Sequence, residues 1–409
     1  MSKKSPQLRF EGFTDDWEER RLSEVLRERN NQQPQSMEYP LVSFTVENGV
    51  TPKTDRYERE QLVVGDKSSK KYKVTVLNDI VYNPANLKFG AISRNKYGNA
   101  VFSPIYVTFS VNNDVTMPEF IEMFITRKDF IKRALKYQQG TVYERQSVSP
   151  ENLLSMNLYL PGKLEQEKIG TFFKQLDDTI ALHQRKLDLL KEQKKGYLQK
   201  MFPKNGEKVP ELRFAGFADD WENRKLSSIA ERVTRKNKNN ESTLPLTISA
   251  QDGLVDQNDY FNKQVASRDV TGYFLVKNGE FAYNKSYSNG YPWGAIKRLD
   301  KYEMGVLSTL YIVFKPTAIN SQFLVSYYET TRWYREVSKN AAEGARNHGL
   351  LNISPNDFFN TLLTIPKSAE EQQQIGSFFK QLDDTIALHQ RKLDLLKEQK
   401  KGFLQKMFV

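Results

Sequence analysis

The feature that most constrains this chain is a long internal repeat. Residues 173–202 return at 379–408 with a single change, in which Tyr197 is replaced by Phe403. The stretches that precede the two copies have diverged far more. A repeat with so long a period indicates one structural frame that is used twice. Each copy of the frame holds a different insert.

A second, shorter repeat opens each half. Residues 8–17 and 212–221 both read Leu-Arg-Phe-x-Gly-Phe-x-Asp-Asp-Trp. A chain of 409 residues is too long for one core and suits two domains. Pro161 and Pro366 precede the long repeats, and Pro203 ends the first one. The predicted parts are an N-terminal segment (1–16), an insert domain (17–160), a central helix (161–203), a linker with the second opening segment (204–220), a second insert domain (221–365) and a C-terminal helix (366–409).

The long repeat has the apolar pattern of a coiled-coil helix. Alternating steps of four and three residues place apolar side chains on one seam, and the other faces carry Lys, Gln, Glu and Asp. Because both copies carry the same seam, the simplest partner for one helix is the other. The predicted seam residues are Leu176, Ile180, His183, Leu187 and Leu190 in the first copy, and Leu382, Ile386, His389, Leu393 and Leu396 in the second.

His183 and His389 occupy the same seam position and allow two interpretations. They form a pH-sensitive or metal-binding pair, or they are polar seam residues that fix the register at some cost in stability. Lys194 and Lys400 also fall on the seam, which favours the second interpretation.

The two inserts share a skeleton although their sequences differ. It consists of strands near 81–83 and 282–284, β-rich runs at 101–109 and 305–314, and helical patterns from 120 to 135 and from 323 to 334. Asn278-Gly279, just before the second of these strands, predicts a two-residue hairpin. We therefore expect two related mixed α/β domains.

The composition of the chain indicates which partners and which cellular compartment to expect. The formal charge of +11 favours a polyanion such as nucleic acid. The chain has no cysteine, which excludes disulfides and thiolate metal sites. No apolar run approaches the roughly 20 residues that span a bilayer, and the first residues lack the apolar segment of a signal peptide. The expectation is a cytoplasmic protein without a membrane partner.

Signatures of catalysis are missing. The sequence contains neither a Gly-x4-Gly-Lys-Ser/Thr phosphate loop nor a strand-linked Gly-x-Gly-x-x-Gly. Its three histidines do not cluster, so a metal site is not expected. Asn83-Pro84-Ala85 matches only part of the Asn-Pro-Pro-Tyr turn of amino-methyltransferases. We predict no catalytic residue, no metal and no cofactor on this chain.

Polar loops in corresponding parts of the two inserts favour the recognition of double-stranded DNA. Arg suits guanine edges, Asn and Gln suit adenine, and Lys supplies phosphate contacts. The candidate residues of the first insert are Tyr82, Asn83, Asn86, Lys88, Arg94, Lys96, Gln138, Gln139, Thr141, Tyr143, Arg145 and Gln146. Those of the second are Tyr283, Asn284, Lys285, Tyr287, Asn289, Tyr291, Lys297, Arg298, Arg346, Asn347 and His348. Taken singly, each of these residues also suits an ordinary solvated loop or a core.

Over essentially its whole length the chain resembles the specificity subunits of type I restriction-modification systems. The resemblance rests on the openings at 8–17 and 212–221 and on the helix starts Ile169-Gly-Thr-Phe-Phe-Lys-Gln-Leu-Asp177 and Ile375–Asp383. Asp79-Ile-Val-Tyr-Asn-Pro84, followed by Gly-Ala-Ile, also resembles the target-recognition domains of that family.

The resemblance implies an α+β fold with a pseudo-two-fold internal repeat. Two target-recognition domains are then joined by two long helices that pack as an antiparallel coiled coil. Each domain reads one half of a split DNA target, and the helices act as spacer and docking scaffold. Two methyltransferase (modification) subunits and the restriction/translocase subunits are the implied partners. S-adenosylmethionine, ATP and Mg²⁺ are then bound by those partners.

Three other functions remain open at this point. The first is a stand-alone regulator or anti-restriction decoy that binds a bipartite DNA site. Such a protein has no methyltransferase partner, so co-purification with a methyltransferase distinguishes it from a specificity subunit. A fused nuclease or methyltransferase acts alone, which the missing cofactor motifs disfavour. A coiled-coil adaptor that does not bind DNA leaves the basic charge unexplained, and a salt-dependent DNA shift excludes it.

Overall fold

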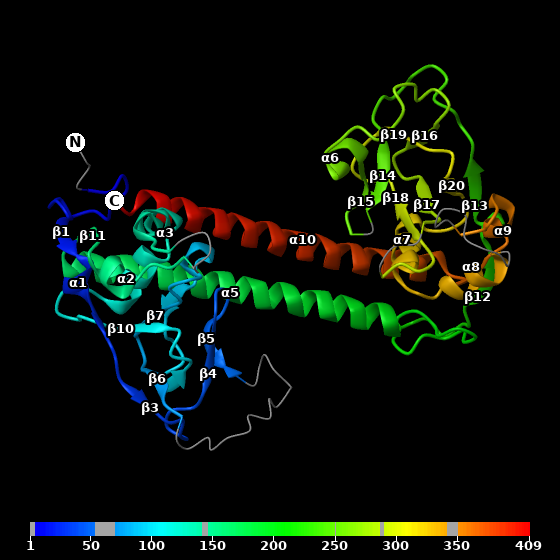
Figure 1. Cartoon of the computed structure of the whole chain (residues 1–409). Helices are drawn as coiled ribbons and strands as arrows, with labels where there is room; N and C mark the ends of the chain where they lie inside the picture. Colours follow the sequence, from blue (N-terminus) through cyan, green and yellow to red (C-terminus); the bar gives the residue numbers. More distant parts are fainter. Residues whose placement is uncertain (1–4, 54–69, 141–145, 250, 287–289, 342–350) are drawn as a thin grey trace. The chain divides into compact units, whose positions relative to one another are not determined.

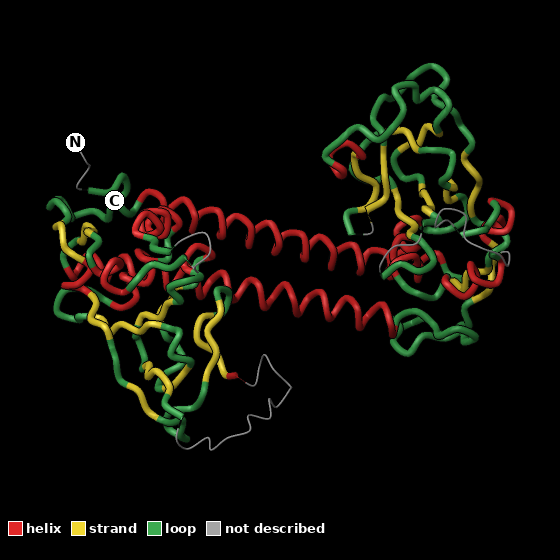
Figure 2. Tube along the Cα trace, in the orientation of Figure 1, coloured by secondary structure: helices red, strands yellow, loops and turns green. Residues whose placement is uncertain are grey.

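The computed structural model describes residues 5–53, 70–140, 146–249, 251–286, 290–341 and 351–409, and every structural statement below refers to these residues. The chain divides into two compact units (Figures 1 and 2). The first unit comprises residues 1–182 and 393–409, and the second comprises residues 183–392. Each unit therefore contains one insert domain and part of each long helix.

The two repeats form the longest helices, α5 (Lys163–Lys200) and α10 (Ala369–Lys406). In the second unit, α5 and α10 run in opposite directions. Tyr197 packs edge-on against Phe378 with ring centroids 5.1 Å apart, and the Nδ1 atoms of His183 and His389 lie 3.4 Å apart. The later residue of α5 thus contacts the earlier residue of α10. In the first unit, the start of α5 packs against the end of α10, where the rings of Phe172 and Phe403 lie 5.1 Å apart. The antiparallel pairing predicted from the resemblance is present in both units.

The seam positions are the covered ones on these helices. Leu187 and Leu393 are each 1% exposed, and the other seam residues are buried or half-buried. Two lysines on or near the seam take ion pairs across it, Lys194 with Asp383 and Lys400 with Asp177, at 2.5 Å in each case. The polar side chains thus enter the seam with a partner, which limits the cost of burying them.

The insert domain of the first unit is built from small antiparallel sheets. A four-stranded sheet has the order β2-β10-β7-β8, a three-stranded sheet β3-β6-β9, and two pairs are β1-β11 and β4-β5. The strands are β1 (Glu18–Arg21), β2 (Leu26–Glu28), β3 (Gln32–Gln33), β4 (Val42–Thr45), β5 (Gly49–Pro52), β6 (Tyr72–Thr75), β7 (Ile80–Tyr82), β8 (Ile92–Arg94), β9 (Ala100–Phe102), β10 (Val107–Val111) and β11 (Asn157–Leu160). The helices are α1 (Leu22–Val25), η2 (Leu87–Phe89), α2 (Pro118–Ile125), α3 (Lys128–Ala134), η3 (Leu135–Tyr137) and α4 (Pro150–Leu154).

The second unit repeats most of this topology, with an isolated bridge between Lys236 and Phe274 where the first unit has β3 paired with β6. Its four-stranded sheet has the order β13-β20-β17-β18, and its pairs are β12-β21, β14-β15 and β16-β19. The strands are β12 (Glu222–Lys225), β13 (Ala230–Val233), β14 (Leu246–Ser249), β15 (Gly253–Asp256), β16 (Phe274–Lys277), β17 (Phe281–Asn284), β18 (Ala295–Arg298), β19 (Met304–Leu307), β20 (Ile312–Pro316) and β21 (Leu362–Ile365). The helices are η4 (Leu226–Ser228), α6 (Gln257–Phe261), α7 (Ser321–Glu329), α8 (Tyr334–Asn340) and α9 (Pro355–Phe359).

Each unit has a core that the end of a long helix completes. In the first unit, Phe408 follows α10 and packs against Trp17 and Phe120, with ring centroids 6.3 and 5.4 Å away. In the second, Phe202 follows α5 and packs in the same way against Trp221 and Phe323, at 6.0 and 5.7 Å. Each insert domain is thus completed by the helix that follows the other insert domain in sequence.

The short opening repeat ties the two helix ends of each unit together. Arg9 makes two hydrogen bonds of 2.7 Å to Glu165 at the start of α5, while the backbone N–H of Leu8 donates to the Lys406 carbonyl at the end of α10. Arg213 and Glu371 make the equivalent pair in the second unit, at 2.7 and 2.8 Å. The two glutamates are each 1% exposed, so these bidentate pairs hold charges that are removed from water and depend on each other.

One detail of the predicted inserts is wrong. Asn278-Gly279 forms a turn, with Gly279 at φ +83°, but β16 and β17 do not pair with each other. The turn instead carries the chain from one sheet to the next. The β-rich runs predicted at 101–109 and 305–314 are confirmed, and each contains two strands. A turn moves the chain between sheets there as well, with Tyr106 N–H donating to the Ser103 carbonyl in the first run.

Within the described part of the chain, no helix combines the length and apolar character that a membrane span requires.

Candidate nucleic-acid interface

The first unit has a polar cleft beside the turn between β7 and β8. Its volume is about 630 Å³, and Asn83, Asn86, Asn48 and Glu47 are among the residues that line it. The Asn83 side chain accepts a hydrogen bond from the backbone N–H of Ala85, at 3.1 Å, which fixes the start of the turn. Asn and Gln amides pair with adenine edges, so this cleft has groups suited to reading a base.

Asn83 and Asn86 are predicted DNA-binding residues, whereas Asn48 and Glu47 are not among the predicted residues. These two residues lie in the turn between β4 and β5, and Ala91 and Tyr106 complete the opposite wall. The Asn48-Gly49 dipeptide marks a turn in the sequence. However, only the fold shows that this turn faces the β7–β8 turn.

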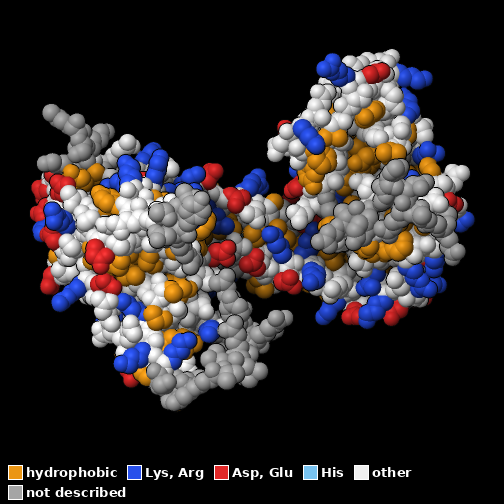
Figure 3. Space-filling model, viewed as in Figure 1, with side chains coloured by type: hydrophobic (Ala, Val, Ile, Leu, Met, Phe, Trp, Pro, Cys, Tyr) orange, Lys and Arg blue, Asp and Glu red, His pale blue; other side chains and the backbone are white. Residues whose placement is uncertain are grey.

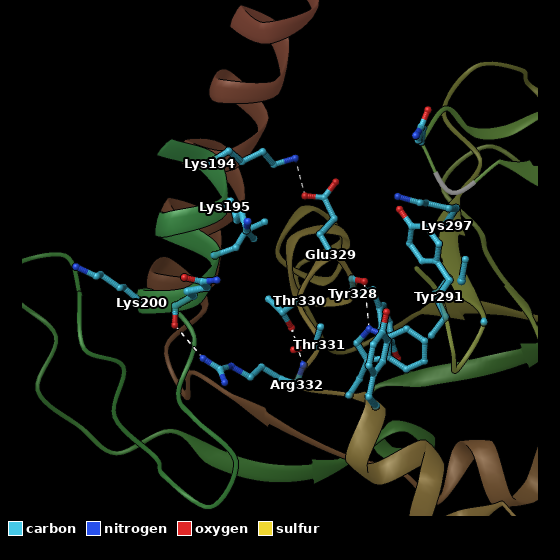
Figure 4. Close-up of a pocket in the computed structure, with 18 of the residues that line it drawn as sticks. Lys194, Lys195, Lys200, Tyr291, Lys297, Tyr328, Glu329, Thr330, Thr331 and Arg332 are labelled. Atoms are coloured by element: carbon cyan, nitrogen blue, oxygen red, sulfur yellow. Dashed lines mark hydrogen bonds and ion pairs between the residues drawn. The ribbon is translucent and has the colours of Figure 1, made fainter. Parts of the chain in front are cut away.

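The second unit has a larger cleft between α5 and the insert domain (Figure 4). Its volume is about 780 Å³. Tyr291 and Lys297, both predicted DNA-binding residues, line it from the insert domain. The helix side and the remaining wall supply further cations, which are Lys191, Lys194, Lys195, Lys200, Lys204 and Arg332.

Two of the residues that line this cleft, Lys194 and Glu329, belong to a cluster of partly buried charges. Lys194 lies 2.5 Å from Asp383 on α10 and 2.6 Å from Glu329 at the end of α7. Burial opposes the charged form of Lys194, but the two carboxylates outweigh it and raise its pKa. Burial also raises the pKa of Asp383, and it lowers the pKa of Lys297. Figure 4 shows Lys297 and Lys194 reaching toward Glu329 from opposite sides.

Tyr82 and Tyr283 do not belong to the interface. Both side chains are completely buried. The Tyr82 hydroxyl donates to the Val148 carbonyl at 3.1 Å, and the Tyr283 hydroxyl donates to the Trp293 carbonyl at 2.9 Å. Burial raises the pKa of each phenol. These tyrosines are core residues with satisfied hydroxyl groups, which corrects the sequence-based assignment.

Arg94 and Arg298 have structural partners that occupy their donors. Arg94 bonds Glu119 and Glu122 of α2, at 2.8 and 3.0 Å. Arg298 likewise bonds Ser321 and Gln322 of α7, at 2.9 and 2.7 Å, and also Asp300. Their side chains are 14% and 15% exposed. Each arginine links the edge of the four-stranded sheet to a helix. This structural role corrects the prediction that Arg94 and Arg298 contact DNA bases.

The remaining described candidates fall into two groups. Lys88, Lys96, Gln139 and Gln146 are exposed, although Lys96 also pairs with Glu122 at 2.9 Å. Gln138, Asn284 and Lys285 are half-buried, as are the cleft residues Asn86, Tyr291 and Lys297. Burial lowers the pKa of Lys285, whose amine donates to the Ile353 carbonyl at 3.3 Å. Eight further candidates lie outside the described residues: Thr141, Tyr143, Arg145, Tyr287, Asn289, Arg346, Asn347 and His348.

The described residues contain no group of three or more His, Cys, Asp or Glu side chains arranged to hold a metal ion. His183 and His389 face each other in the helix seam and are each half-buried.

Comparison with protein families decides the class of the chain. Residues 14–192 and 218–398 each match the family described as the type I restriction modification DNA specificity domain. The chain belongs to this family. It is a specificity subunit of a type I restriction-modification system, a DNA-recognition protein without catalytic activity, and its two insert domains are target-recognition domains.

A solved structure supports the fold, and a second one is reported beside it. The S subunit of a type I restriction-modification system from M. genitalium is 14% identical, with a TM-score of 0.58 over 99% of both chains. The HsdS subunit from Thermoanaerobacter tengcongensis is 17% identical, with a TM-score of 0.48 over 96% of both chains. A search of curated protein sequences finds no match.

Proposed function

We propose that each target-recognition domain of this specificity subunit reads one half of a bipartite DNA target. The observation that carries this proposal is the pair of unlike clefts on a repeated frame. The first cleft presents amides and a carboxylate, whereas the second is lined mainly by lysines, with an arginine, tyrosines and two glutamates. The surface of both units carries Lys and Arg side chains (Figure 3), in keeping with the charge of +11. Because the two insert domains have diverged in sequence, we expect the two half-sites to differ.

Methylome sequencing of cells that carry this chain and its methyltransferase tests the proposal. The expected result is a gapped modified motif with two different halves. Replacing residues 221–365 by the corresponding domain of another specificity subunit is then expected to change one half only. Replacing residues 17–160 serves as the matched control and is expected to change the other half. A continuous motif, or a swap that alters both halves, contradicts the proposal.

We also propose that the helices set the unread spacer between the half-sites. Residues 182–188 of α5 and 388–394 of α10 are identical heptads. Deleting both removes about 10 Å of helix, since the rise is about 1.5 Å per residue. The expected result is a spacer shorter by about three base pairs, at roughly 3.4 Å per base pair, with both half-sites retained. A modified motif with unchanged spacing refutes this role.

The helices further offer a docking surface in each unit for the methyltransferase subunits. Leu189 is 52% exposed and lies one heptad from Gly196 in the second unit, while Leu395 is 47% exposed and lies one heptad from Gly402 in the first. A Cβ added at either glycine meets no atom within 4 Å, so the fold itself does not require glycine there. A mid-helix glycine costs about 1 kcal/mol relative to alanine. Close approach of a partner explains why it is kept in both copies.

Equivalent surfaces bind two copies of the same partner. Leu189→Asp and Leu395→Asp are each expected to reduce the number of bound methyltransferase subunits from two to one, as measured by mass photometry. Val209→Asp, at another exposed apolar residue, is the control and is expected to leave both bound. In this proposal the restriction/translocase subunits join the same assembly, S-adenosylmethionine, ATP and Mg²⁺ are bound by the partners, and the complex acts on DNA in the cytoplasm.

A further inference from the structure

The lysine cleft of the second unit is formed by the frame as well as by the target-recognition domain. One wall is the last part of α5, which contributes Lys191, Lys194 and Lys195. The facing wall, from the domain, includes Tyr291 and Lys297. A helix that served only as a spacer would need no cations facing a recognition surface.

The cations of this cleft differ in whether they already have an anionic partner. Lys194 is held by Asp383 and Glu329, and Lys204 pairs with Glu211. Arg332 donates to the Gln199 carbonyl at 2.9 Å. By contrast, Lys191, Lys195, Lys200 and Lys297 form no ion pair with any residue that the structure describes. The cleft therefore holds uncompensated positive charge.

The geometry of α5 gathers two of these free cations. Lys191 and Lys195 are four residues apart, so they lie on the same helix face about 6 Å apart at Cβ. Both side chains are exposed. Lys297 lies across the cleft, where burial lowers its pKa, so a bound anion favours its charged form.

The second copy of the helix provides an internal comparison. Lys397 and Lys401 of α10 are the repeats of Lys191 and Lys195, and they are equally exposed. The cleft described in the first unit has no lining residue from either long helix.

The domain surface also differs between the units. In the aligned sheets and helices, Arg94 corresponds to Arg298 and Phe120 to Phe323. By this alignment the positions of Lys297 and Glu329 are occupied in the first unit by the uncharged residues Ser93 and Thr126. These two positions are thus charged in the second unit only.

We propose that Lys191 and Lys195 of α5 bind backbone phosphates of the target duplex, so that the frame helix forms part of the DNA-binding surface of the second unit. This inference rests on the proposed DNA-binding function and adds to it a contact that carries no sequence information. Phosphate contacts fix the register and orientation of a protein on the duplex, while base contacts specify the sequence. The first unit uses no equivalent pair from α10.

The test compares two double variants of the full-length chain. One is Lys191→Gln with Lys195→Gln, and the control is Lys397→Gln with Lys401→Gln, which removes the same charges from identical helix positions. Binding to a labelled duplex is measured by fluorescence anisotropy across a range of KCl concentrations, with the wild-type chain in parallel. One duplex carries the modified motif and a second has both half-sites scrambled. Thermal unfolding of each variant is measured to establish that it folds, as expected for exposed lysines.

The expected result is a salt slope for the first variant that is smaller by about 1.8, because each phosphate contact contributes about 0.9. Affinity falls roughly tenfold per lysine at about 0.1 M salt, to the same degree for both duplexes. The control variant keeps the wild-type slope and affinity.

Equal losses in the two variants show an effect of net charge alone and overturn the inference. An unchanged slope in the first variant also overturns it, as does a loss confined to the motif duplex, which indicates base contact. In each of these outcomes the wild-type chain still binds DNA and the proposed function stands. If the wild-type chain binds neither duplex, the proposed function fails as well.

Discussion

Removal of the aromatic ring at the end of α10 is expected to loosen the first unit and leave the second intact. Phe408 is 5% exposed and contacts the rings of Trp17, Phe120 and Phe124, and the Arg127 guanidinium lies 5.0 Å from its ring centroid. Replacement of a buried Phe by Ala costs about 3–5 kcal/mol. We take the lower end of this range, about 3 kcal/mol, for Phe408→Ala.

Hydrogen exchange measured by mass spectrometry reports this loss locally. A change of about 3 kcal/mol corresponds to roughly a hundredfold faster exchange in amides that open with the unit. The acceleration is expected in residues 118–125 of the first unit, and residues 321–329 of the second unit keep their rates. Phe202→Ala is the matched variant, and it is expected to give the reverse pattern.

Two outcomes refute the reasoning. If Phe408→Ala leaves exchange in residues 118–125 unchanged, the ring does not stabilise the core that it contacts. If both variants accelerate exchange in both segments alike, the units do not open separately, and the assignment of each helix end to one core is wrong.

Three further predictions concern residues whose role the structure reassigns or defines. Tyr82→Phe removes one hydrogen bond to Val148 and is expected to lower the free energy of unfolding by about 1 kcal/mol in urea titrations, with the methylated motif unchanged; an altered motif returns Tyr82 to the interface. Arg94→Ala leaves Glu119 without its cationic partner and Glu122 with Lys96 alone, and it is expected to lower the free energy of unfolding by about 1–3 kcal/mol, again with the same methylome. Glu329→Gln removes a negative charge that neutralises Lys194, so DNA affinity in anisotropy titrations is expected to rise several-fold at low salt; weaker binding contradicts the view that Glu329 competes with phosphate.

The repeated helices could be predicted in detail because their evidence is local and occurs twice. A seam with a period of three and four residues identifies its own buried face, and Leu187 and Leu393 are indeed covered. The interface was harder to predict because residue type does not report exposure. Tyr82 and Arg94 have side chains that suit DNA, yet one completes a core and the other ties a sheet to a helix.

The clefts could not be predicted because each joins segments that are distant in sequence. Asn48 and Asn86 line one cleft because two turns pack together, and Lys195 and Lys297 line the other because a helix packs on a domain. The proximity of such residues depends on which sheets stack and which turns face each other. Hydrophobic periodicity does not contain this information.

The closure of each core by a helix end has a consequence for synthesis on the ribosome, where domains tend to fold as they emerge. All residues of the second unit lie between 183 and 392, so its parts are present as soon as that stretch has been translated. The first unit cannot complete its fold until residues 393–409 have been translated, and these residues are made after all its other parts. The domain that begins first is therefore finished last. A chain whose translation stops before residue 393 contains all residues of the second unit but lacks the segment that completes the core of the first unit. Both units can therefore form only after residues 393–409 have been translated.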